Sequence, residues 1–414
     1  MADVSVFGAG FINYYSHIIC RTRSGRLYAG GAVSNLAHWS PAWTYSDDNG
    51  STWATPTYFN NMRPTWAPAG LNDYIGQCMA VDGGDNVHCA WRDADNFLIW
   101  YTQLQADRLG WTTPKVIGTN TVIPHPPKVV IGSDNSVNVL YTQGTEAVPA
   151  TGWCVTSLDS GSTWKTRGYT QSGGGSVNIA GPMGACADNA GLIHVVYTRT
   201  DGTQPVIRYT TYDPSTQTFA NDATVSAAGH RAIEPDIAIG ADDSKHITYA
   251  GIIPDHEGHL SFMYARYTGG AWQVSELLHE PSQDVRQTAV SCSFDPIASG
   301  STGVYYVYCC ARIYIDATSQ YEIRGTYAIG PNYNLFSALT TYSDNTIANN
   351  KAYTGLAYQR YPHWMIPRYG FGLSYLVETN YDFRYTSWEG IIGSSTPAVW
   401  NPWYPVFGTI KPLA

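Results

Sequence analysis

Arginine, histidine and tyrosine side chains occur in this 414-residue chain at positions where they could bind and process an acidic sugar. A guanidinium group can hold a carboxylate through two parallel hydrogen bonds, and an imidazole can accept or donate a proton near neutral pH. The candidate ligand-binding residues are Arg92, His125, Arg231, Arg286, Arg312, Tyr361 and His363. No catalytic residue is assigned among them. No metal ion and no cofactor are expected, because no motif with a complete ligand set is present.

These candidates fall beside the strands of a repeat. The segments CMAVDGGDNVHCAW (78–91), VVIGSDNSVNVLY (129–141), GACADNAGLIHVVY (184–197) and IAIGADDSKHITY (237–249) share one pattern. Each has an apolar strand, a tight turn rich in Asp and Asn, and an alternating strand that ends on an aromatic residue. The final aromatic residues, at positions 91, 141, 197 and 249, are 50, 56 and 52 positions apart. Such spacing is typical of the blades of a β-propeller.

Weaker copies of the pattern complete a ring of seven units. They lie at 17–31, 289–308 and 364–375, and a second pair of strand-like runs follows each copy. Seven units in 414 residues leave about 59 residues for each (414/7), which suits four strands. The sequence therefore predicts an all-β fold, a seven-bladed β-propeller with four-stranded antiparallel blades in one domain. The domain spans 1–414, and its expected blades lie at approximately 12–60, 74–118, 126–170, 181–224, 234–280, 287–342 and 360–410.

Ring closure is expected to use both ends of the chain. Residues 3–7 (DVSVF) alternate as a strand does, and they could pair beside residues 398–407 (AVWNPWYPVF) in the last blade. Such a pairing would remove an exposed sheet edge.

Two nearly identical phrases mark the turn between the third and fourth strands of two units. YSDDNGSTW (45–53) and SLDSGSTW (157–164) both contain S-x-D-x-G-x-T-W. In each phrase the Asp carboxylate can accept hydrogen bonds from backbone N–H groups of a tight turn, and Gly supplies the positive φ that the turn needs. The residues with this expected structural role are Ser46, Asp48, Gly50, Trp53, Ser157, Asp159, Gly161 and Trp164.

These phrases match the Asp-box, or bacterial neuraminidase repeat, so the chain resembles the sialidase-like propeller superfamily over most of its length. In that superfamily the box lies on the face opposite the ligand site and serves structure. The resemblance therefore implies that a ligand meets the loops between second and third strands and the loops between blades. The seven candidate residues are expected on that face, where they would bind a glycan.

The arginine motif of true sialidases is absent from the sequence. That family carries F/Y-R-I-P on the first inner strand, whereas this chain has YYSHII there, with Ser16 in place of the arginine. Arg21 and Arg23 lie further along the strand and cannot simply substitute. We therefore expect no sialidase activity.

Two classes of function stay open. The first is recognition without catalysis, because a propeller with few Lys and many Tyr, Trp, Asn, Ser and Thr resembles the glycan-binding or structural propellers of viral particles such as phage tails and capsids. The main expectation is a virion-associated host-recognition propeller that binds a glycan or acidic polysaccharide, with other virion proteins as further partners. The alternative is a carbohydrate-active enzyme, a polysaccharide lyase or glycoside hydrolase, in which Arg neutralises a carboxylate while His and Tyr move protons. Each candidate side chain could instead pair with a neighbouring carboxylate or backbone group.

Composition argues against other partners. The net charge is −9 and only six residues are Lys, so no nucleic acid is expected as a partner. No apolar run approaches the roughly 20 residues of a membrane helix, and the first residues lack the pattern of a signal peptide. The sequence thus predicts synthesis in the cytoplasm and no membrane insertion. The eight Cys lie mostly in apolar runs and are predicted to be unpaired thiols.

Overall fold

The computed structural model describes most of the chain between residues 4 and 387. The described ranges are 4–5, 11–12, 19–22, 24–35, 38–48, 50–59, 77–93, 97–106, 110–119, 125–145, 148–169, 179, 183–200, 204–240, 242–254, 258–295, 304–317, 320–331, 333, 335–341, 372–377 and 382–387. Within these ranges the chain forms β-strands and no helix. Tyr361, His363 and residues 398–407 lie outside the described residues.

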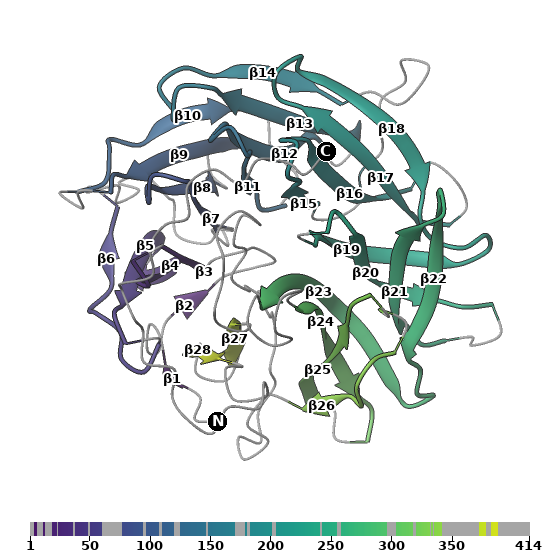
Figure 1. The fold of residues 1–414 in the computed structure, drawn as a ribbon. Helices are drawn as coiled ribbons and strands as arrows, with labels where there is room; N and C mark the ends of the chain where they lie inside the picture. The colour runs from purple at the N-terminus through teal and green to yellow at the C-terminus, as the bar shows by residue number, and fades with distance from the viewer. Residues whose placement is uncertain are drawn as a thin grey trace.

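The strands form seven sheets arranged around a common axis (Figure 1). The first sheet contains β2 (Phe11–Ile12), β3 (Ile19–Arg21), β4 (Leu27–Asn35), β5 (His38–Ser46) and β6 (Thr57–Tyr58). The second contains β7 (Gln77–Val81), β8 (Val87–Asp93), β9 (Leu98–Leu104) and β10 (Lys115–Gly118). The third contains β11 (Lys128–Ile131), β12 (Val137–Thr145), β13 (Val148–Ser157) and β14 (Lys165–Gly168). The fourth contains β15 (Gly184–Ala187), β16 (Ile193–Arg199), β17 (Val206–Asp213) and β18 (Thr218–Thr224).

The remaining sheets complete the ring. The fifth contains β19 (Arg231–Ile239), β20 (Lys245–Ile252), β21 (Ser261–Thr268) and β22 (Ala271–Leu278). The sixth contains β23 (Gln283–Asp295), β24 (Val304–Ile315), β25 (Gln320–Ile329) and β26 (Thr340–Thr341). The last contains β1 (Val4–Ser5), β28 (Asp382–Ser387) and β27 (Gly372–Val377), in that order.

The predicted all-β propeller with antiparallel blades is confirmed, but the predicted count of seven four-stranded blades is wrong for the described residues. Six sheets have at least four strands, and the last has three. The N-terminal strand β1 does join the last sheet, where Val4 lies opposite Tyr385 of β28. A pairing of the N-terminus with residues 398–407 stays a prediction, because that segment lies outside the described residues.

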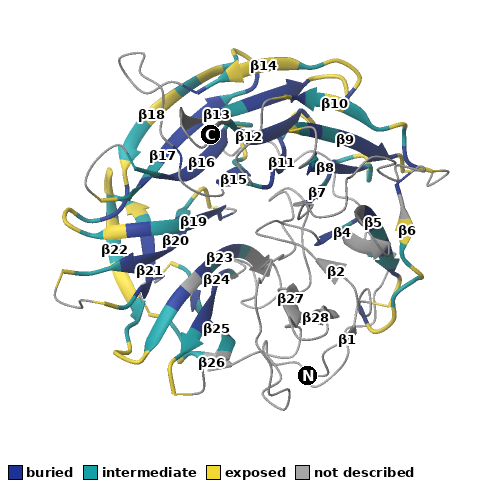
Figure 2. Cartoon of the chain, turned by 180° about the vertical axis from the view of Figure 1, so that it is seen from behind, coloured by how far each residue is buried: buried dark blue, intermediate teal, exposed yellow. Residues whose placement is uncertain are grey.

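Apolar side chains fill the spaces between neighbouring blades. The inner strands β7, β11, β15 and β19 surround the axis and are mostly buried, whereas the outer strands β14, β18 and β22 carry most of the exposed positions (Figure 2). At the contact between the first two blades, the ring of Phe59 stacks on that of Trp91 with centroids 5.4 Å apart. None of the eight Cys forms a disulfide, in agreement with the prediction, and seven of them are buried.

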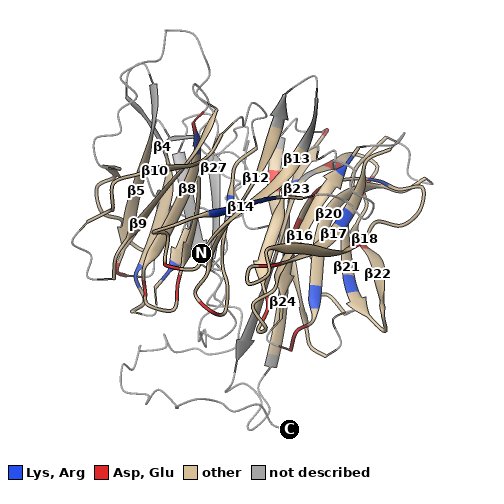
Figure 3. Cartoon of the chain, turned by 90° about the horizontal axis from the view of Figure 1, so that it is seen from above, with Lys and Arg blue, Asp and Glu red and all other residues tan. Residues whose placement is uncertain are grey.

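Antiparallel strand order gives the ring two different faces, which Figure 3 shows from the side. The turn face carries the turns from first to second strands, at 82–86, 132–136, 188–192 and 240–244, and the turns from third to fourth strands. The loop face carries the opposite strand ends, and residues 92, 93, 97 and 125–128 belong to it. Several turns on the turn face contain Asp or Glu (Figure 3).

The two S-x-D-x-G-x-T-W phrases fold into the same turn. The N–H of Gly50 donates to the buried Ser46 hydroxyl at 2.8 Å, and the Asp48 carboxylate accepts from the N–H and hydroxyl of Thr52 at 2.8 and 2.6 Å. The second copy repeats these bonds with Gly161, Ser157, Asp159 and Thr163 at 2.7, 2.8 and 2.7 Å. Both glycines have φ 85°. Trp53 and Trp164 begin the return toward the outer strand and are partly buried.

Candidate functional site

Arg92 and His125 come together on the loop face, between the second and third blades. Arg92 is the penultimate residue of β8 and pairs with Ile99 of β9, so it sits where the strand reaches the loop face. His125 lies just before β11. It is followed by Pro126 and Pro127, which are buried and have fixed φ angles. These elements bring a guanidinium from one blade close to an imidazole from the next.

The electrostatics of this pair favour a charged arginine and a neutral histidine. Arg92 is only 3% exposed, and burial lowers its pKa to about 10 although the adjacent Asp93 carboxylate acts in the opposite direction. Arg92 therefore stays protonated at neutral pH. Burial, and then the positive charge of Arg92, lower the pKa of His125 to about 4. A neutral imidazole that keeps partial exposure can accept a proton from a ligand.

Other side chains complete the surroundings of Arg92. The hairpin that joins β8 to β9 is closed by the pairing of Asp93 with Leu98. Phe97 directly precedes Leu98, and its ring centroid lies 6.0 Å from the Arg92 guanidinium carbon. Lys128, the first residue of β11, is also buried. Sequence reasoning missed Phe97 and Lys128. The available signal for Phe97 was the turn-like segment RDADNF, which ends on an aromatic residue. No sequence pattern could show that this side chain is exposed.

The other predicted ligand-binding residues are distributed over other blades. Arg231 is the exposed first residue of β19, in the fifth blade. Arg312, in β24 of the sixth blade, is buried, with its guanidinium carbon 3.5 Å from the ring centroid of Tyr321. Arg286 lies in β23 at a point where the pairing with β24 shifts register. Of the five predicted residues that the structure describes, Arg92 and His125 are the two that it brings together, and Tyr361 and His363 lie outside the described residues.

Neighbouring inner strands carry irregularities near the loop face. In β19 the pairing with β20 shifts between Ile233 and Asp236, and Glu234, inside the shift, has φ 54°. In β23 the shift lies between Val285 and Gln287. Such β-bulges re-aim side chains and are common beside active sites. The two irregularities in β19 and β23 therefore lie where a ligand bound at the loop face could contact them.

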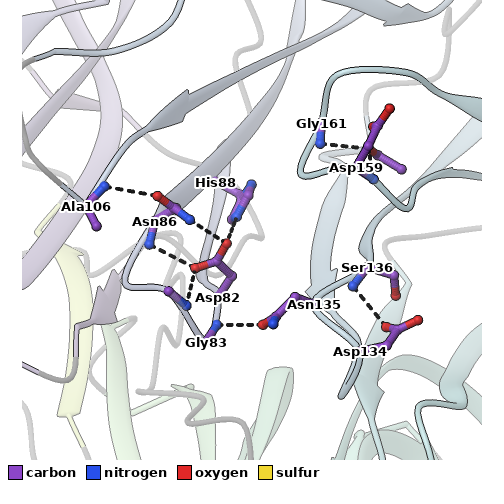
Figure 4. A network of polar contacts seen from close by, with 12 residues as sticks. Asp82, Gly83, Asn86, His88, Ala106, Asp134, Asn135, Ser136, Asp159 and Gly161 are labelled. Carbon is purple, nitrogen blue, oxygen red and sulfur yellow. Dashed lines mark hydrogen bonds and ion pairs between the residues drawn. The ribbon is translucent and has the colours of Figure 1, made fainter.

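Buried histidines on the turn face have a different role. In the second blade, the Asp82 carboxylate can only accept, so Nε2–H of His88 donates to it at 3.1 Å (Figure 4). Nδ1 of His88 forms a second hydrogen bond, with the hydroxyl of Tyr101, at 2.7 Å. Asp82 also accepts from the backbone N–H of Asn86 at 2.9 Å. The histidine thus connects a turn to the third strand of its own blade.

The same chain of hydrogen bonds recurs in other blades. His194 bonds to Asp188 at 3.0 Å and to Tyr209 at 2.7 Å in the fourth blade. In the fifth blade the members are Tyr264, His246, Ser244 and Asp242. Asn138 occupies the equivalent position of the third blade, where it accepts from Thr156 at 2.8 Å. Because the histidines are buried and have two partners each, we assign them to the scaffold rather than to catalysis.

The turn face also links blades to one another. The N–H of Gly83 donates to Oδ1 of Asn135 in the next blade at 2.8 Å (Figure 4). The Asn189 amide donates to Asp243 at 2.9 Å and connects the fourth blade to the fifth. Lys115 reaches the Gly161 carbonyl of the third blade. These bonds connect the second blade to the third and the fourth blade to the fifth on the turn face.

Two further searches concern only the described part of the chain. It contains no group of three His, Cys, Asp or Glu side chains placed to hold a metal ion. Within the same ranges, no helix is long and apolar enough to cross a membrane.

The fold of this chain resembles that of polysaccharide lyases whose structures have been solved. No protein-family model and no curated protein sequence matches the chain. An ulvan lyase of polysaccharide lyase family PL25, bound to -[GlcA(1-4)Rha3S]-, is 10% identical with a TM-score of 0.61, and the match covers 93% of this chain and 96% of that one. The polysaccharide lyase Uly1 is 10% identical with a TM-score of 0.56, covering 93% of this chain and 98% of that one. The chain therefore shares the propeller fold of these proteins.

Proposed function

We propose that the protein is a carbohydrate-active propeller that binds an acidic polysaccharide on its loop face and cleaves it by β-elimination beside a uronate. The observation that carries this proposal is the coupled pair of a charged Arg92 and a neutral, partly exposed His125. The likeness to ulvan lyases supports it at the level of fold. One of those proteins is described as bound to an oligosaccharide that contains glucuronate and a sulfated sugar.

The chemistry follows from the two side chains. The charge of Arg92 would stabilise the uronate carboxylate and the negative charge that develops on it when the C5 proton leaves. His125 would accept that proton. A C4–C5 double bond then forms, the C4–O bond breaks, and the departing oxygen takes a proton from the imidazolium or from water. The carboxylate would also offset the field of Arg92, which raises the pKa of His125 and makes it a stronger base.

This proposal changes the order of the two classes of function. The proteins reported above are described as polysaccharide lyases and not as virion components, so we place the carbohydrate-active alternative first. Association with a virion and synthesis in the cytoplasm stay predictions. Recognition of an acidic glycan without cleavage is the second candidate, because Arg92 would attract a carboxylate in either case.

Incubation with a panel of polysaccharides tests the reaction. Polymers of glucuronate, iduronate, galacturonate and mannuronate should include one that yields an unsaturated product, seen as a rise in ultraviolet absorbance. His125→Gln should lower kcat/KM by about 10²–10⁴-fold, the usual contribution of a general base. The control Arg167→Gln changes an exposed arginine of β14 and should leave the rate unchanged. Reducing ends without the absorbance would indicate a glycosidase, and binding without any product would indicate recognition alone.

A further inference from the structure

Phe97 is exposed and strained where a loop-face hairpin enters β9. Its side chain is 39% exposed, and among the described aromatic residues only Tyr267, at 38%, is also in the exposed class. Its φ is 55°, in the left-handed region that a bulky side chain rarely adopts. Glycine would occupy this conformation without the steric cost. The conformation therefore has a cost for folding, and an exposed phenyl ring gains little burial to offset it.

Strain of this kind is often retained where a side chain must be presented to a ligand. The ring of Phe97 lies 6.0 Å from the guanidinium carbon of Arg92, and Arg92 in turn interacts electrostatically with His125. The hairpin that carries Phe97 is closed by the pairing of Asp93 with Leu98. An exposed aromatic face is thus fixed next to the pair that the proposed reaction uses.

We propose that Phe97 is a stacking platform for the sugar ring that adjoins the uronate held at Arg92 and His125. This inference rests on the proposed function only in assigning the uronate to that pair. One face of a pyranose ring is formed by C–H groups, and an aromatic ring covers such a face while leaving the hydroxyl groups at the rim to solvent. Phe97 would therefore favour oligosaccharides over single uronates, because only an oligosaccharide reaches both positions.

The test compares variants at Phe97 in the His125→Gln background, where turnover does not disturb binding. Calorimetric titration with tetrasaccharides of the four uronates gives Kd, and a thermal scan gives Tm. Phe97→Gly should weaken tetrasaccharide binding about 10-fold and leave monosaccharide binding unchanged. Because the strain is removed, it should also raise Tm by about 1–3 °C. Phe97→Tyr should keep Kd within about 3-fold, since it keeps the aromatic face.

Gln217 supplies the matched control. It has φ 56° in a turn between third and fourth strands of the fourth blade, on the opposite face. Gln217→Gly should raise Tm by a similar amount and leave Kd unchanged. Equal Kd values for Phe97→Gly and its parent, or a loss of binding accompanied by a lower Tm, would overturn the platform. If the chain with His125 intact gives no unsaturated product, the proposed reaction fails while the comparison of Kd values still decides the role of Phe97. If no tetrasaccharide binds, both ideas are wrong.

Discussion

Two kinds of histidine occur in this propeller, and their partners distinguish them. Burial lowers the pKa of both His125 and His246, to about 4 and about 3. His246 is fully enclosed and has hydrogen-bond partners at both ring nitrogens. His125 keeps partial exposure and lies beside a charged arginine. A lowered pKa alone therefore does not distinguish the two histidines, and the role proposed for His125 rests on its partial exposure and on the neighbouring charge of Arg92.

The titration of His125 can be measured directly. We expect NMR of the ring protons to give a pKa near 4, which means that the imidazole is neutral throughout the physiological range. In Arg92→Gln the midpoint should move upward, because the removed positive charge opposes protonation. Burial is the larger cause, so the midpoint should remain below the ordinary value of about 6.5. A midpoint near 6.5 in the unchanged protein would remove the electrostatic argument for a buried base.

At the scale of elements, each blade is held by polar contacts that its own strands and turns supply. A turn aspartate, a histidine at the start of the second strand and a tyrosine of the third strand form one hydrogen-bonded chain in the second and fourth blades. In the fifth blade the Ser244 hydroxyl stands between His246 and Asp242. The third blade uses Asn138 instead. An uncharged amide can thus replace the histidine, which shows that this position needs hydrogen bonds rather than protonation.

The presence of Asn138 at the equivalent position suggests a substitution, His246→Asn, that tests how acid lowers the free energy of unfolding. The folded pKa of His246, about 3, lies below that of an unfolded histidine, so the unfolded state binds the proton first as the pH falls. This contribution to stability is complete above about pH 6.5 and is lost at up to about 1.4 kcal/mol per pH unit toward pH 3. His246→Asn should cost about 1–3 kcal/mol at pH 7, through the lost bond to Tyr264, but flatten the decline between pH 6 and 4. Urea unfolding at both pH values measures the difference, and an unchanged m-value serves as the control. An equal decline in both proteins would contradict it.

At the scale of the whole molecule, ring closure depends on a short pairing between segments that are far apart in sequence. β1 pairs with β28, so Val4 and Ser5 occupy the edge of the last sheet (Figure 1). A paired edge offers no free row of backbone groups to another molecule. The stability of the last sheet should therefore depend on residues 4–5.

Deletion of residues 1–5 tests this dependence. We expect Tm to fall by about 2–4 °C and light scattering near Tm to increase, because β28 becomes an open edge. Leu335→Ser, a change at a side chain that is 74% exposed, is the control and should alter neither quantity. An unchanged Tm after the deletion would mean that β1 does not contribute to closure.

Local signals made most of the fold predictable and little of the site. Turn chemistry and strand alternation in segments such as 78–91 and 129–141 identified the blades, because these features depend only on neighbouring residues. The coupling of Arg92 to His125 depends on how two blades pack, and no local pattern encodes that distance. The burial of His88 could not have been inferred from strand alternation, because every residue of β8 from Val87 to Arg92 is buried, on both sides of the strand.

The separation of the two faces also bears on how such a protein can change over generations. The bonds from Gly83 to Asn135 and from Asn189 to Asp243 lie on the turn face, whereas Arg92, His125 and Phe97 lie on the loop face. Heritable substitutions in the loops can therefore alter what is bound without loosening the ring. The loop-face residues of such a propeller can therefore change while the fold is kept, as expected of a fold that is shared at 10% identity.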